Sequence, residues 1–269
     1  MISPVWPVLA MVLARADASP AMPYEAARLV ALVGAIRAAD YRGEREELRH
    51  LARALDAIND PRLVAYRRYW QGFAQWRRAL NGFNQTPWPA DLKDDLEGAV
   101  LSFRAALAAD PDWIEAKVGI IGCSGSLLFL AGEDPTAKQK ILADYLLLFR
   151  DVAAKGDENP RALWLIGGAQ LGAPPPYGGD AAKAAATMQK GLEAAQREAL
   201  GRPAVPAYVP TWGGAENLMN LAYLYSHSAL QNRALALAYA EGALVAAPDW
   251  HYVRDILMPQ IRALGEPGR

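Results

Sequence analysis

A recurring spacing of small and large apolar residues constrains this chain more than any other feature. Ala99, Phe103 and Ala106 lie four and three positions apart, and Pro111 follows five positions later. The full spacing recurs at Ala236, Ala240, Ala243 and Pro248. Its first part recurs at Ala184, Met188 and Gly191. Residues four and three apart share one helix face, and small residues there let a second helix approach closely. The spacing predicts repeated, tightly packed helices.

The rest of the chain shows the same helical periodicity. Alanine and leucine dominate, and no segment alternates with a period of two. We therefore predict an all-α fold with three irregular stretches, at 83–89, 172–179 and 200–213; the last two are too rich in proline for helix. The predicted helices are 23–39, 44–58, 61–82, 90–108, 112–131, 135–154, 160–171, 180–199, 214–230, 233–246 and 250–263.

Several predicted helices begin at an Asp or Asn followed by proline. The pairs are Asp60-Pro61, Asp110-Pro111 and Asn159-Pro160, and Asp249-Trp250 follows Pro248. The acidic or amide side chain can accept hydrogen bonds from the free N–H groups of the first turn, and proline is tolerated there. Asp180 follows Gly178-Gly179 and is expected either to cap the next helix or to line a ligand loop with Tyr177.

These features resemble the tetratricopeptide repeat, in which antiparallel helix pairs stack into a superhelix. The resemblance rests on Ala99/Phe103/Ala106/Pro111, on Asn220-Leu221-Ala222 with Ala236/Ala243/Pro248, and on Gly168 with Ala184/Gly191. It covers roughly 61–263 and implies about five stacked pairs with inserted Pro/Gly-rich loops. The family repeats every ~34 residues, whereas the proline boundaries here lie at 61, 111, 160 and 248. The longer gaps imply degenerate units and inserted loops.

A shorter stretch resembles a second group. Pro176-Tyr177-Gly178-Gly179-Asp180, ahead of the helix at Lys183, is similar to a loop of exported bacterial repeat proteins, among them the small periplasmic partner of some TRAP-type transporters. That resemblance implies a ligand-binding accessory of a transporter.

The N-terminus points to export. Val5 to Ala14 is a short apolar core, and Ala16-Asp17-Ala18 follows as an A-x-A pattern. No Lys or Arg precedes this core, and Pro4 and Pro7 interrupt it, so a helix docked on the first repeat is the alternative. We expect residues 1–18 to be a signal peptide, 19–269 to form a single repeat domain, and the location to be periplasmic or secreted, otherwise cytoplasmic.

The charge balance and the reactive residues argue against several classes of function. Lys plus Arg number 28 and Asp plus Glu 29, so no overall basic field is present to hold nucleic acid. No apolar run has the length of a membrane span. His50, His227 and His251 are far apart, and Cys123 lies in a predicted helix, where we expect a buried, inert thiol. We expect no metal, no cofactor and no catalytic residue.

The segment from Pro61 to Ala90 combines arginines with aromatic residues and contains no carboxylate. Its arginines are Arg62, Arg67, Arg68, Arg77 and Arg78, and its aromatic residues share one helix face: Tyr66, Tyr69, Trp70, Phe73 and Trp76. One interpretation is an anion-binding wall, because the guanidinium group suits carboxylate or phosphate. The other is an aromatic core stripe whose arginines pair with Asp91, Asp94, Asp95 and Glu97.

The leading functional expectation is a non-catalytic scaffold that binds a protein or peptide partner on its concave side. The alternatives are a periplasmic accessory that binds a small anionic ligand, and an enzyme on a helical scaffold. The first helix of each pair should line the concave side, and loops should fold over it. The candidate binding residues are Tyr66, Tyr69, Arg77, Gln170, Tyr177, Trp212, Asn217, Asn220 and Tyr223.

Overall fold

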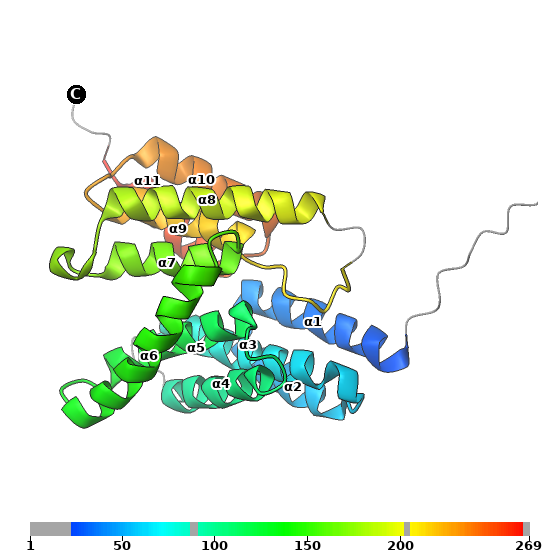
Figure 1. Cartoon of the computed structure of the whole chain (residues 1–269). Coiled ribbons are helices and arrows are strands. Elements are labelled where there is room, and N and C mark those ends of the chain that lie inside the picture. Colours follow the sequence, from blue (N-terminus) through cyan, green and yellow to red (C-terminus); the bar gives the residue numbers. More distant parts are fainter. Residues whose placement is uncertain (1–22, 87–90, 202–204, 266–269) are drawn as a thin grey trace, which may run out of the picture.

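The computed structural model describes residues 23–86, 91–201 and 205–265 (Figure 1). The proposed signal peptide at 1–18 lies outside these ranges. Helix accounts for 79% of the structure and no strand occurs in the described ranges, which confirms the all-α expectation. The α-helices are α1 Tyr24–Arg42, α2 Arg45–Ala54, α3 Val64–Phe83, α4 Leu92–Leu107, α5 Ile114–Leu130, α6 Pro135–Lys155, α7 Pro160–Gly172, α8 Ala181–Leu200, α9 Gly214–His227, α10 Arg233–Ala246 and α11 Met258–Ala263.

Shorter helical turns complete the chain. Three are 3₁₀ turns, at Leu55–Ala57, Pro61–Leu63 and Pro175–Tyr177, and one is a π-helical segment, Tyr252–Leu257. The π segment ends two residues before Pro259, which has no N–H to donate to the carbonyl one turn back. Within the described ranges, no helix combines the length and the apolar character that crossing a bilayer requires.

The predicted caps account for where several helices begin. The Asn159 side chain accepts hydrogen bonds from the N–H groups of Arg161 and Ala162 at the start of α7. Asp180 does the same for Ala182 and Lys183 at the start of α8, so capping is its role in this structure.

Helices that follow one another pack together as pairs, in the manner of a solenoid, and the recurring spacing marks their crossings. Ala99, Ala106, Ala236 and Ala243 are fully buried, as expected. Phe103 of α4 lies between two glycines: a Cβ at Gly72 of α3 or at Gly119 of α5 would come within 3.0 or 2.4 Å of its ring. Met188 of α8 lies in the same way against Gly167 of α7. The glycines therefore make room for the large residues Phe103 and Met188.

The first helices of the pairs form a continuous inner layer. α1 contacts α3, α3 contacts α5, α5 contacts α7 and α7 contacts α9. The first pair also meets the last, because the ring of Tyr41 on α1 lies 5.0 Å from that of Trp250 ahead of the π segment. Helix α1 therefore touches the C-terminal part of the array.

Helix α6 departs from the other second helices. It runs obliquely between the lower helices α1–α5 and the upper helices α7–α11 (Figure 1). Val152 is its one fully buried residue, whereas α4 buries five. Its residues Ile141, Tyr145 and Leu148 repeat the spacing of four and three, with large residues at every position. Helix α6 packs on α5, while its contacts with α4 and α7 are few.

Candidate functional site

The concave side predicted to bind a partner is filled by the chain itself. The segment 205–213, between α8 and α9, descends to α1 and α3 (Figure 1). Trp70 donates from Nε1 to the Tyr208 carbonyl at 2.7 Å, and Arg37 of α1 donates to the Thr211 hydroxyl at 3.2 Å. The ring of Tyr66 packs edge-on against Tyr208 and Trp113, with centroids 4.9 and 5.1 Å away.

Trp212 is the centre of this packing. It is 2% exposed, and its Nε1 donates to the Tyr69 hydroxyl at 2.7 Å. Its ring lies within 6 Å of Phe73, Trp76 and Trp164, measured between centroids. The expectation that Trp212 and Tyr69 line an open groove is therefore wrong. Both are core residues, and the aromatic stripe of α3 is a core stripe.

Arg77 is buried in an ion pair away from any groove. Its Nε donates to both carboxylate oxygens of Asp40 at 2.8 Å, and Asn81 also donates to Asp40. Burial raises the pKa of Asp40, while Arg77 acts in the opposite direction. The expected partners Asp94 and Asp95 are wrong for Arg77, because α1 packs on this side of α3. The next residue, Arg78, faces α4 and pairs with Asp91 and Asp95.

Asn217 is likewise internal, which corrects its assignment to a binding surface. Its side-chain N–H groups donate to the carbonyls of Pro160 and Gly213, at 3.0 and 2.6 Å. Gly213 adopts a φ of +117°, which favours glycine, and its N–H donates to Glu216. Glu216 in turn accepts from the Tyr41 hydroxyl at 2.9 Å. This network ties the loop to the first and last helix pairs.

The remaining predicted residues stay at or near the surface but do not converge. Tyr66 is half-buried, Gln170 accepts from the Thr187 hydroxyl, and Tyr177 is 82% exposed on its 3₁₀ turn. Tyr223 stacks on His227 with centroids 4.4 Å apart. Asn220 lines a niche of about 320 Å³ between α5, α7 and α9, whose other lining residues include Gly125, Tyr145, Trp164 and Gly168.

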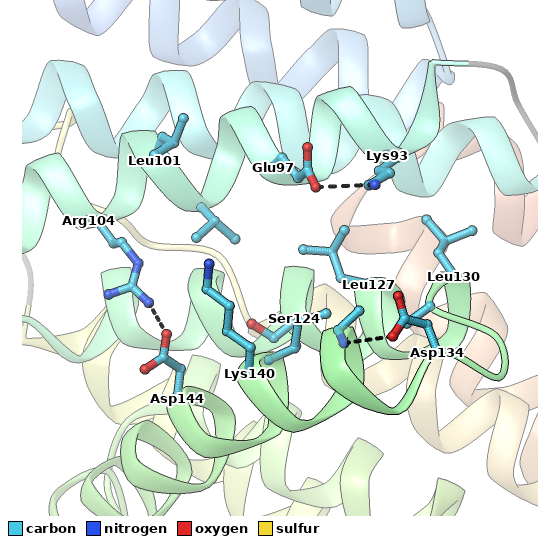
Figure 2. A pocket seen from close by; sticks show the side chains of 14 residues that line it. Lys93, Glu97, Leu101, Arg104, Ser124, Leu127, Leu130, Asp134, Lys140 and Asp144 are labelled. Atoms are coloured by element: carbon cyan, nitrogen blue, oxygen red, sulfur yellow. Dashed lines mark hydrogen bonds and ion pairs between the residues drawn. The ribbon is translucent and has the colours of Figure 1, made fainter.

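A larger groove lies elsewhere, between α4 and α6 with α5 as its floor (Figure 2). Its volume is about 650 Å³, within the range of ligand sites. The apolar lining residues come from all three helices: Val100, Leu101, Leu127, Leu130 and Ile141. Leu101 is 69% exposed, a large apolar side chain left in water at the edge of the groove. We refer to this site as the α4–α6 groove.

Charged residues border the α4–α6 groove at both ends. Lys93 and Glu97 pair along α4 at one end, and Arg104 of α4 pairs with Asp144 of α6 at 2.6 Å at the other. Asp134 is occupied as the cap of α6. Apolar lining residues bordered by charged pairs are common in binding interfaces.

Sequence reasoning missed this groove. It lies where α6 packs on α5 but leaves α4. The signal was Ile141 and Leu148, which are large at the first and third positions of the spacing, where the other units have Ala or Gly.

Reactive chemistry is not evident in the described part of the chain. Cys123 is fully buried, and burial raises the pKa of its thiol well above the ordinary value. No group of His, Cys, Asp or Glu in these ranges is arranged to hold a metal ion. Comparisons with protein-family models, curated proteins and solved structures gave no match.

Proposed function

We propose that this chain is a tetratricopeptide-like repeat scaffold that binds a helical segment of a partner protein in the α4–α6 groove. The observation that carries the proposal is the arrangement of α4 and α6, which both pack on α5 and leave an apolar channel between them (Figure 2). Two helices over a third form a cradle that one more helix completes, with its apolar face in the channel.

The concave side of the array is already occupied, which favours a binding site elsewhere. Repeat scaffolds bind along their concave surface, but here segment 205–213 and its Trp212 occupy that position. The α4–α6 groove is the larger of the openings that remain beside α5.

Site-specific photocrosslinking in native cells tests the proposal. A photoreactive residue replaces Leu101 in the groove or, as the control, Val245 on α10; both are exposed, at 69% and 84%. We expect an adduct at position 101 whose partner peptide carries apolar residues at helical spacing, and none at position 245. Equal adducts at the two positions, or no adduct at 101, would refute it.

Export belongs to the same proposal. It rests on the apolar core Val5 to Ala14 and on Ala16-Asp17-Ala18. Mass spectrometry of the protein from native cells should find a mature chain that begins at Ser19. An intact start at Met1 or Ile2 would remove the periplasmic assignment.

A further inference from the structure

The α4–α6 groove contains one cation that its own walls do not neutralise. Lys140 extends from α6 toward α4 into the middle of the groove (Figure 2). Among the described residues it forms no ion pair, although Asp144 lies one turn further along α6. Asp144 instead binds Arg104 across the groove at 2.6 Å.

A helix lying in the groove would take water away from Lys140. An ammonium ion that loses its water is strongly destabilised unless a negative group replaces it. Glu97 and Asp144 each already bind a cation of the rim. The missing negative charge must therefore come from the occupant.

We propose, on the basis of the function proposed above, that the partner helix is acidic at its centre and places an Asp or Glu carboxylate on Lys140. The length of the groove fits such a helix. Lys93 and Arg104 mark its two ends on α4, and eleven residues at about 1.5 Å each span about 17 Å, or about three turns.

The apolar lining sets the pattern of that helix. Leu127 and Leu130 lie on one side of Lys140 (Figure 2), and Val100 and Leu101 of α4 also line the groove, so the lining provides contacts for apolar side chains beside the carboxylate. Positions i, i+3, i+4 and i+7 share one helix face. The partner therefore carries apolar residues at i, i+3 and i+7 and the acidic residue at i+4.

An acyl chain with a carboxylate head would also supply apolar contacts and a negative charge for Lys140. The groove favours a helix because it is an elongated channel between two helices, with charged pairs at both ends rather than at one. The acyl ligand is treated as an outcome of the test.

The test uses two labelled helical peptides with leucines at i, i+3 and i+7, one with Glu and the other with Lys at i+4. Fluorescence anisotropy measures their binding to the unaltered protein, to Lys140→Glu, to Leu101→Glu and to the control Lys183→Glu, which makes the same charge change on α8. Circular dichroism and thermal unfolding verify that each variant is folded.

We expect the Glu peptide to bind the unaltered protein and Lys183→Glu at least about tenfold more tightly than the Lys peptide, as for a charged hydrogen bond. Lys140→Glu should reverse that preference, and Leu101→Glu should weaken both peptides.

Equal binding of both peptides, weakened by Leu101→Glu but unaffected by Lys140→Glu, overturns the acidic partner and leaves the proposed function standing. Binding of neither peptide overturns both. Binding of laurate to the unaltered protein but not to Lys140→Glu, with no peptide binding, assigns the groove to an acyl carboxylate and also overturns both.

Discussion

Helices α4 and α6 hold the same place in successive pairs, yet they pack differently. α4 presents Ala99, Phe103 and Ala106 to its neighbours and buries all three. α6 presents Ile141, Tyr145 and Leu148 at the same spacing, and all three remain half-exposed. The spacing alone sets which face turns inward. The two helices differ in the size of the residues on that face and in how completely the face is buried.

The largest loss of stability is expected at the middle position of the spacing, where the packing of α4 and α6 can be compared directly. Phe103 and Tyr145 hold the middle position of the spacing on the two helices. Phe103→Ala should lower the free energy of unfolding by about 3–5 kcal/mol, because it leaves a cavity between Gly72 and Gly119. Tyr145→Ala should cost only about 1 kcal/mol. Chemical denaturation measures both, and equal losses would mean that α6 is packed as tightly as α4.

The second largest effect is expected at the buried ion pair of Arg77 and Asp40. The matched substitution is at Lys140 in the open α4–α6 groove. Arg77→Met leaves the Asp40 carboxylate buried and without its cation, and should cost about 3 kcal/mol. Lys140→Met, in the groove, should leave the unfolding free energy within about 0.5 kcal/mol of the unaltered protein. A stability loss in the groove variant as large as that of Arg77→Met would contradict the contrast.

Replacing alanine by leucine should destabilise the protein at the buried helix crossings but not at an exposed position. Ala106→Leu and Ala243→Leu insert bulk at closed crossings and should each cost about 1–3 kcal/mol. Ala143→Leu, on the exposed side of α6, is the matched control and should be close to neutral. Unchanged melting temperatures for the first two would disprove the repeat register.

Acid should destabilise the protein at the polar contact between α2, α3 and α4. Burial by itself would raise the pKa of Asp91, but hydrogen bonds from Arg45 and Arg78 lower it to about 2, from 3.8. Because the folded pKa lies below the unfolded one, the stabilisation is complete above pH 3.8 and disappears as the pH falls to about 2. Asp91→Asn should flatten the stability profile in that window; an unchanged slope would show that Asp91 is not responsible.

The smallest effect is expected on the outer side of α6. Leu147 is 69% exposed, so Leu147→Gln should change the unfolding free energy by less than about 0.5 kcal/mol. Urea denaturation measures it, and a loss above 1 kcal/mol would indicate that this side chain is packed.

The helices could be predicted from the sequence because their signals are local. The caps at Asn159 and Asp180 and the spacing around Phe103 each act within a turn or two of helix. The binding residues could not be predicted in this way. Whether Trp212 points into a groove or fills one depends on where a loop more than a hundred residues from Tyr69 comes to lie.

The surroundings of Arg77 and Lys140 could not be predicted for the same reason, because they depend on helices that are remote in sequence or on several helices together. Asp91, Asp94 and Asp95 were the near acidic residues in sequence, but the partner of Arg77 is Asp40, on a helix that precedes it by 37 positions. Lys140 gave no signal by itself. Its setting arises from three helices at once, and single-helix periodicity contains no information about their separation.

The contact between the first and last helix pairs has a consequence for how the chain reaches its structure. An open solenoid holds only neighbour contacts, so it can nucleate anywhere and lose an end without losing the rest. Here Tyr41 donates to Glu216 across 175 positions and packs on Trp250. Contacts so remote in sequence slow folding, because a long loop must close before they form. Removal of either terminal pair should therefore weaken the opposite end of the molecule.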